Sequence, residues 1–155
     1  PHETFGKPLP KEVPLHISKT FDEARLVRKF SPRASCALLR ICLEEILIEA
    51  SKVLYDADTS KMVENANNAH RKIEILKSKK DFKFRLDEGI WDFAEKIKEL
   101  GNDNSHAIQK IPDSDANETF GSLCLFIEEI AKNLISKLDL KQRLESITQN
   151  IANKS

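Results

Sequence analysis

Hydrophobic positions recur at helical spacing through most of the chain. Apolar residues three or four positions apart lie on one face of an α-helix, whereas a strand places them at alternate positions. The helical spacing first appears at Ile17, Phe21, Ala24 and Val27. It predicts a first helix from Ile17 to about Lys29.

A second helix is predicted to begin at Ser31 and Pro32 and to run to about Tyr55. A serine side chain can accept a hydrogen bond from a free backbone N–H at a helix start, and proline suits the first helical position. The apolar stripe of this helix consists of Leu39, Cys42, Leu43, Ile46, Ala50 and Val53, with Leu38, Ile41 and Ile48 on a neighbouring face. A stripe this broad predicts a central helix.

The rest of the chain predicts further helices and no sheet. A polar first half weakens the helix predicted over 62–76, and the stretch 78–85 is expected to be a connection. Helical spacing returns over 90–100 and then over a long stretch from 117 to 138, which predicts a second central helix. A shorter terminal helix over 140–151 is expected to pack outside the bundle or to fray. The predicted fold class is an all-α bundle of five to six helices with two long central ones.

Length and composition predict one domain. A chain of 155 residues, 40% hydrophobic and 32% charged, can bury a single core. Four of its six prolines lie in the first 14 residues, so we expect an extended lead-in over 1–16 and a single helical domain over 17–155. Because the chain begins at Pro1 and its one methionine is Met62, we expect a piece of a longer protein with additional domains.

The charge balance and the cysteine positions restrict which partners, metals and cellular compartment we expect for this chain. Twenty-five basic residues balance 25 acidic ones, so any nucleic-acid site must be a local patch. No apolar run is long enough to span a bilayer, and no membrane partner is expected. Three cysteines stand in apolar helical segments without metal-ligand spacing, which favours reduced core residues in a cytoplasmic protein: Cys36, Cys42 and Cys124. We expect no cofactor and no metal.

His106 is the best single candidate for chemistry. It lies in a polar segment after Gly101, and Asn102 precedes it by four residues. The alternative is structural: Gly101 ends the preceding helix, while Asn102 and His106 tie the loop by hydrogen bonds. The spacing alone favours this structural interpretation.

Two arginines are candidates for phosphate binding. Arg33, Arg40 and Glu44 are spaced i, i+7, i+11, so they share one face of the second predicted helix. The arginines could converge on a phosphate while Glu44 orients Arg40. Equally, Arg40 and Glu44 could form an ordinary ion pair.

A run of basic residues with two phenylalanines follows at 77–85. This composition could hold a nucleic-acid backbone and stack a base on Phe82 or Phe84. We favour the simpler interpretation, a solvated loop with two buried aromatic rings. A cysteine nucleophile assisted by His106 is disfavoured, because cysteines among aliphatic neighbours are usually inert.

Taken together, these segments resemble an uncharacterised bacterial family of the HEPN superfamily. The resemblance rests on FDEA at 21–24, SPRASCALLR at 31–40 with Glu44 after it, and GN at 101–102 followed by His106. It covers about 8–138 and implies a HEPN-like helical bundle that dimerises. Relatives occur in restriction, toxin and phage-defence proteins, often after a zinc ribbon, whose cysteines this chain lacks.

The resemblance also implies RNA or nucleotide recognition. Active HEPN domains are metal-independent ribonucleases: a histidine assists attack of the ribose 2′-hydroxyl on the adjacent phosphate, and an arginine, separated from the histidine by four to six intervening residues, stabilises the added charge. His106 and Asn102 match two positions of that motif, but Glu99, Leu100 and Gly101 stand where the arginine is expected. The similarity therefore predicts a catalytically degenerate domain that binds RNA or nucleotide phosphates. The alternatives are a ribonuclease that uses His106 with a displaced arginine, and an architectural domain for dimerisation or partner docking.

Overall fold

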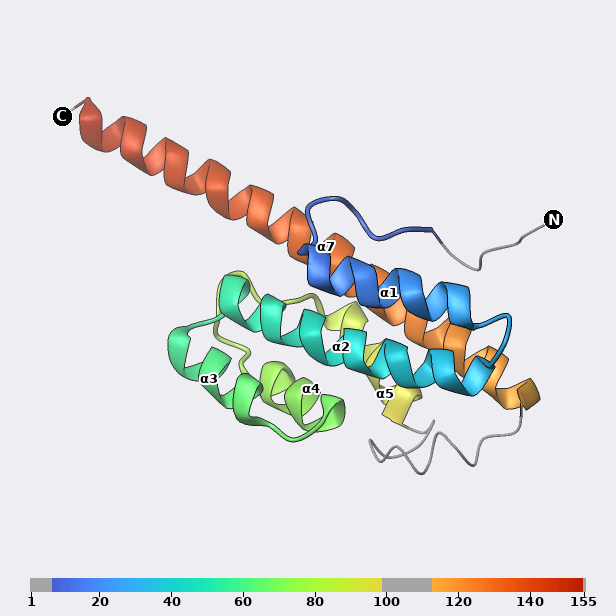
Figure 1. Ribbon diagram of the computed structural model, residues 1–155. Helices are drawn as coiled ribbons and strands as arrows, with labels where there is room; N and C mark the ends of the chain where they lie inside the picture. The colour runs from blue at the N-terminus through green and yellow to red at the C-terminus, as the bar shows by residue number, and fades with distance from the viewer. Residues whose placement is uncertain (1–6, 99–112, 155) are drawn as a thin grey trace.

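The described residues, 7–98 and 113–154 of this computed structural model, form six α-helices (Figure 1). In chain order they are α1 Leu15–Val27, α2 Pro32–Leu54, α3 Ala57–Asn65, α4 Ala69–Ser78, α5 Glu88–Lys98 and α7 Asp113–Asn153. No strand occurs among these residues. The predicted all-α bundle with two long central helices is confirmed for the described part of the chain.

The bundle is organised around α2 and α7. These two helices make the most extensive contact in the fold, and α1 packs along α2 beside them, while α3 and α4 cover another side of α2 (Figure 1). One continuous core joins every described helix and includes Leu9 and Val13 from the lead-in. The largest completely buried side chains are Phe21, Phe120 and Phe126, with Ile17, Leu39, Leu43, Ile46, Leu47, Leu54, Leu76, Leu86 and Leu123.

The start of α2 is as predicted. The Ser31 hydroxyl oxygen accepts a hydrogen bond from the backbone N–H of Ala34 at 3.1 Å, and Pro32 is the first helical residue. Most of the predicted stripe is buried, although Val53 is only half-buried. Ile41 was predicted to widen the apolar face, but it is 49% exposed and lies at the surface.

The single helix predicted over 62–76 is wrong, because two helices occupy this stretch. Helix α3 begins earlier, where the Asp56 carboxylate accepts a hydrogen bond from the backbone N–H of Thr59 at 2.7 Å. The chain then turns at Ala66, and Asn68 caps α4 by accepting a hydrogen bond from the N–H of Arg71 at 2.8 Å. Two side-chain caps about 12 residues apart favour two short helices over one long one.

The separate terminal helix predicted over 140–151 is also wrong. Helix α7 begins at Asp113, four residues before the predicted start, and continues without a break to Asn153. Its 41 residues correspond to about 60 Å at 1.5 Å per residue. The C-terminal part projects away from the rest of the bundle (Figure 1).

Within 7–98 and 113–154, no helix combines the length and apolar character needed to cross a bilayer. The three cysteines are buried and unpaired, as predicted for core residues. Helix α1 begins at Leu15, two residues before the predicted Ile17, and ends at Val27.

Candidate phosphate-binding site

The two candidate arginines lie on one long face of α2. Arg33 is exposed in the first turn, and Arg40 is half-buried two turns later. Seven residues correspond to about 10 Å along the helix axis, which is greater than the width of one phosphate group. The two side chains therefore mark a surface along α2.

Arg40, Glu44 and Lys72 form a partly buried group of charges where α2 meets α4. Burial lowers the pKa of the Arg40 guanidinium, and the negative charge of Glu44 opposes this change. Burial likewise raises the pKa of the Glu44 carboxyl, while Lys72 and Arg40 act in the opposite direction. The orienting role of Glu44 stays a prediction. Lys72 is a third charged residue of this group, and the spacing of residues on α2 could not indicate it.

Lys72 has a structural role of its own. Its side chain is almost completely buried, and its ammonium donates hydrogen bonds to the backbone carbonyls of Val63 at 2.7 Å and Ala66 at 2.8 Å. These carbonyls lie at the end of α3, where helices leave acceptors without backbone donors. Lys72 thus joins the end of α3 to α4 while its charge acts on Glu44.

The arginine face of α2 lies beside the beginning of α7. The Cys36 thiol, three residues after Arg33, contacts the backbone carbonyl oxygen of Ala116 at 3.3 Å. Asn102 and His106 belong to the segment that joins α5 to α7, and both lie outside the described residues. Their role is therefore a proposal, taken up below.

The cysteines have the properties of core side chains. Burial raises the pKa of Cys36 to about 11, and the charge of Arg40 opposes this shift. Burial is also the main cause that raises the pKa of Cys42 and of Cys124 to about 12. Thiols of this kind stay protonated at neutral pH and react slowly.

Both aromatic rings of the basic run at 77–85 are half-buried. Phe82 stacks on Tyr55 with ring centroids 5.7 Å apart and packs, like Phe84, against the core. The Tyr55 hydroxyl accepts a hydrogen bond from the buried backbone N–H of Leu86 at 3.1 Å. These contacts favour the simpler interpretation of this run, although the rings are half-buried where the prediction had them buried.

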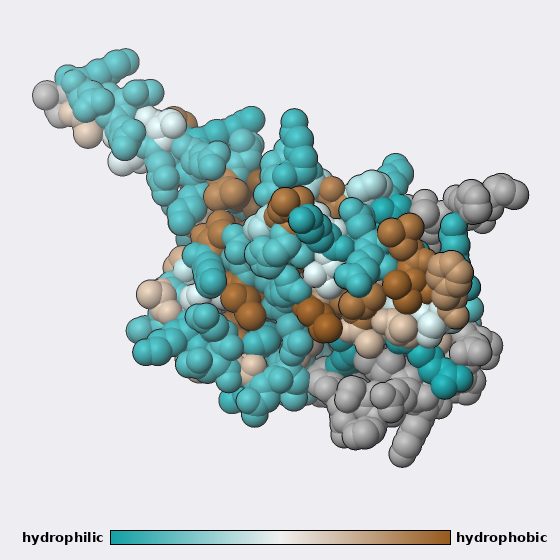
Figure 2. All heavy atoms as spheres, in the orientation of Figure 1, coloured by the Kyte–Doolittle hydropathy of each residue, from teal (hydrophilic) through white to brown (hydrophobic). Residues whose placement is uncertain are grey.

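A second basic segment, which the search for basic and aromatic runs missed, joins α1 to α2. Arg28, Lys29, Phe30 and Arg33 are called the basic turn below. Phe30 is 89% exposed, and hydrophobic side chains gather at the surface over the end of α1 and the start of α2 (Figure 2). The Arg28 guanidinium lies 5.3 Å from the centre of the Phe120 ring of α7, a cation–π contact that fixes part of the turn on the bundle.

The basic turn belongs to a longer stretch of one charge sign. Residues 24–43 contain five basic side chains and no carboxylate, in a chain whose net charge is zero: Arg25, Arg28, Lys29, Arg33 and Arg40. Arg25 is buried and forms an ion pair with Asp22, three residues earlier on α1, at 3.1 Å between guanidinium and carboxylate. The other four follow the surface from the turn along α2.

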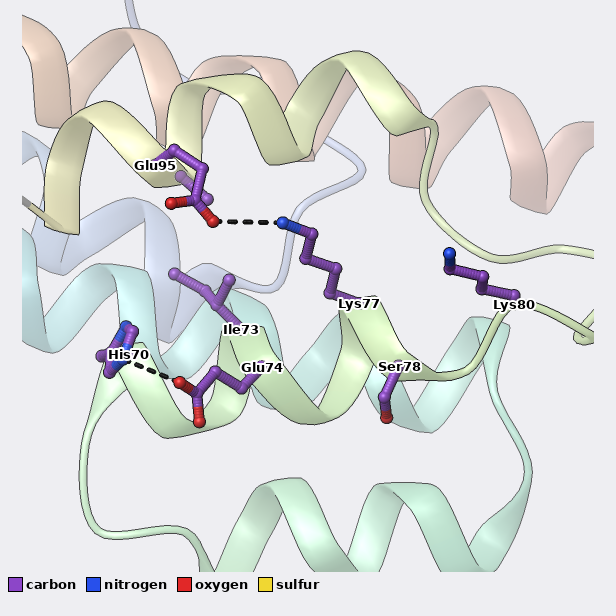
Figure 3. A pocket seen from close by; sticks show the side chains of 8 residues that line it. His70, Ile73, Glu74, Lys77, Ser78, Lys80 and Glu95 are labelled. Atoms are coloured by element: carbon purple, nitrogen blue, oxygen red, sulfur yellow. Dashed lines mark hydrogen bonds and ion pairs between the residues drawn. The ribbon is translucent and has the colours of Figure 1, made fainter.

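A pocket of about 350 Å³ between α4 and α5 is a weaker candidate (Figure 3). His70 lies 2.9 Å from Glu74, and Lys77 lies 3.1 Å from Glu95. The lining contains two carboxylates, Glu74 and Glu95, and two lysines, Lys77 and Lys80, so the pocket has little net charge to attract an anion. No group of three metal-ligating side chains occurs among the described residues.

Comparison with protein-family models shows which family the chain belongs to. The model of a domain of unknown function, DUF4145, matches residues 22–153, which is most of the chain. The chain belongs to the DUF4145 family. Neither the curated proteins nor the solved structures contain a match to it.

The DUF4145 match contains all the candidate positions described above. It begins within α1, includes the basic turn and the arginine face of α2, and extends into the projecting part of α7. The sequence signal for the basic turn in this DUF4145 chain is the absence of acidic residues between Glu23 and Glu44. A count of charge sign along the chain would have identified it, whereas a search for dense basic and aromatic runs selected 77–85.

Proposed function

We propose that this DUF4145 domain recognises RNA or nucleotide phosphates, as a HEPN-like and catalytically degenerate member of a bacterial defence, restriction or toxin-type system. Arg33 and Arg40 bind phosphate oxygens, Glu44 orients Arg40, and Asn102 and His106 complete the site. The domain acts in the cytoplasm as a homodimer, over residues 17–155. No cofactor takes part.

The observation that carries the proposal is the single charge sign of residues 24–43 beside an exposed aromatic ring. Cationic side chains contact the phosphate backbone, and aromatic rings stack unpaired bases. The basic turn supplies both within a few residues, with Phe30 exposed between Lys29 and Arg33. A single-stranded nucleic acid uses both features, and RNA is the ligand proposed here.

The position of the two arginines supports a shared site with His106. The arginine face of α2 lies beside the start of α7, since Cys36 contacts Ala116. The segment that carries Asn102 and His106 leads directly into that start. Substitutions at the arginines and at His106 test separately whether each contributes to phosphate binding.

Binding of a mixed RNA pool in chelator, measured by filter retention with cleavage scored in parallel, tests the proposal. Phe30→Ala should weaken binding by about 1–3 kcal/mol, or about 5- to 150-fold, because a stacked base loses its platform. Arg33→Ala should reduce the slope of log affinity against log salt by about one. His106→Ala and Arg40→Ala should also weaken retention.

Two matched variants control for general surface effects. Met62→Ala removes an exposed apolar side chain from α3, and Lys52→Ala removes an exposed cation near the other end of α2. Both should bind RNA as the unmodified protein does. Retention unchanged in Phe30→Ala, Arg33→Ala and His106→Ala would refute the proposal, and cleavage that His106→Ala abolishes would establish a metal-independent ribonuclease instead.

A further inference from the structure

The projecting part of α7 carries an apolar stripe. Leu140, Leu144, Ile147 and Ile151 follow one another at spacings of four, three and four residues, and are called the tail stripe below. Leu140 is 46% exposed, Ile147 54% and Ile151 67%. This spacing is the heptad pattern of helices that pair with another helix.

A helix with an exposed apolar stripe is stabilised when another surface packs against that stripe. Isolated helices shorter than about 12–15 residues are marginal in water, and tertiary packing supplies most helix stability in proteins. The projecting part contacts the rest of the bundle at its base, where the Lys141 ammonium lies 3.4 Å from the backbone carbonyl oxygen of Val53. Beyond that base, Ile147 and Ile151 are exposed to solvent in the single chain, and Leu144 is half-buried.

An apolar groove lies where the tail leaves the bundle. Its volume is about 400 Å³, and its apolar lining is Val13, Pro14, Val53, Leu134, Ile135 and Leu138. Hydrophobic side chains gather in this region in Figure 2. Its lining also contains three acidic residues, Glu12, Glu49 and Asp139, and the Asp139 carboxylate lies 3.2 Å from the Arg143 guanidinium.

We infer that the tail stripe and this groove together bind a second copy of the chain, with the two tails antiparallel. This names a surface for the homodimer proposed above, and it does not depend on RNA recognition. When Leu144 of one chain lies opposite Ile147 of its partner, Ile151 lies opposite Leu140. The last turn of each tail then reaches the groove of the other chain.

Charge and symmetry favour this occupant. After Glu145 the tail carries no acidic residue, and Lys154 is the one charged side chain in this part of it. The positive charge of Lys154 complements the acidic residues in the lining of the groove. Two heptads alone are fewer than a stable coiled coil usually needs, so the groove supplies additional contact. The same two surfaces serve both chains, as an interface with two-fold symmetry requires.

Sedimentation of the whole chain across a wide concentration range tests the inference. The unmodified protein should change from a monomer of 17.7 kDa to a dimer as concentration rises. Ile147→Glu should remain monomeric at every concentration while the bundle keeps its melting temperature, because residue 147 lies outside the core. Gln149→Glu, which adds the same charge on the opposite side of the tail, should still dimerise.

Disulfide cross-linking tests the antiparallel arrangement. A mixture of Leu144→Cys and Ile147→Cys proteins should cross-link readily, whereas each protein alone should cross-link poorly. A parallel pair would give the reverse result. An unmodified protein that stays monomeric, or a dimer that Ile147→Glu leaves intact, would overturn the inference. RNA retention by Ile147→Glu is measured separately, so failure of one proposal is distinguishable from failure of the other.

Discussion

Replacement of Lys72 by methionine tests the connection between α3 and α4. Methionine keeps the length and apolar stem of the side chain but removes the ammonium. The carbonyls of Val63 and Ala66 then lose the donors that lie 2.7 and 2.8 Å away. Lys72 is only 3% exposed, so water has little access to take the place of the ammonium.

The magnitude follows from these two hydrogen bonds. A hydrogen bond to a charged group contributes about 1.5–3 kcal/mol, and removal of a buried ammonium recovers part of its desolvation cost. Glu44 also loses a nearby positive charge that lowers its pKa. We expect Lys72→Met to reduce the free energy of unfolding by about 2–4 kcal/mol, which lowers the melting temperature by about 4–16 °C for a chain of this size.

Urea unfolding followed by circular dichroism measures this change directly. Lys61→Met is the matched control, because Lys61 is an exposed lysine on α3 and should change stability by less than about 0.5 kcal/mol. Equal stabilities of the Lys72 and Lys61 variants would refute the reasoning, since the two buried hydrogen bonds would then contribute nothing net.

Three further predictions concern other buried or paired groups. Tyr55→Phe leaves the buried N–H of Leu86 without its acceptor and should cost about 1–3 kcal/mol in urea unfolding, although the ring stack is kept. Hydrogen bonding to Asn133 and Lys137 lowers the pKa of Asp87, so this group contributes stability above its unfolded pKa that is lost as pH falls through the lower folded value. Asp87→Asn should therefore flatten the acid side of a stability–pH curve, and an unchanged curve would contradict the assignment. A thiol reagent at neutral pH should modify the native protein slowly and the urea-unfolded protein at three sites, and fast modification of the native state would contradict the raised pKa values of Cys36, Cys42 and Cys124.

Local signals predicted the start of α2 well. Ser31 and Pro32 act within one helical turn, so their effect does not depend on distant residues. The boundaries of α3 and α4 were not predicted. The polar stretch between Val63 and His70 could be read as a weak helical face, whereas Asp56 and Asn68 each cap a separate helix.

The candidate site depends more on distant contacts. Nothing in the run at 77–85 shows that Phe82 stacks on Tyr55, 27 positions earlier in the chain. Lys72 likewise joins the charges of α2 through the packing of α4, which no spacing within α2 could predict. In the sequence, the basic turn is visible as part of a stretch without acidic residues. Its importance depends on the exposure of Phe30, which only the fold determines.

The central pairing of α2 with α7 affects how the chain folds during synthesis. Cys36 and Ala116 are in contact although 80 residues separate them. At about 5–20 residues per second, a ribosome takes on the order of several seconds to produce that interval. Helix α1 can cover part of α2 as soon as both have emerged, but the side of α2 that faces α7 waits for the last helix to be made. A nascent or truncated chain that ends before α7 therefore exposes half of its central helix, and this is the stage at which a molecular chaperone would have most to protect.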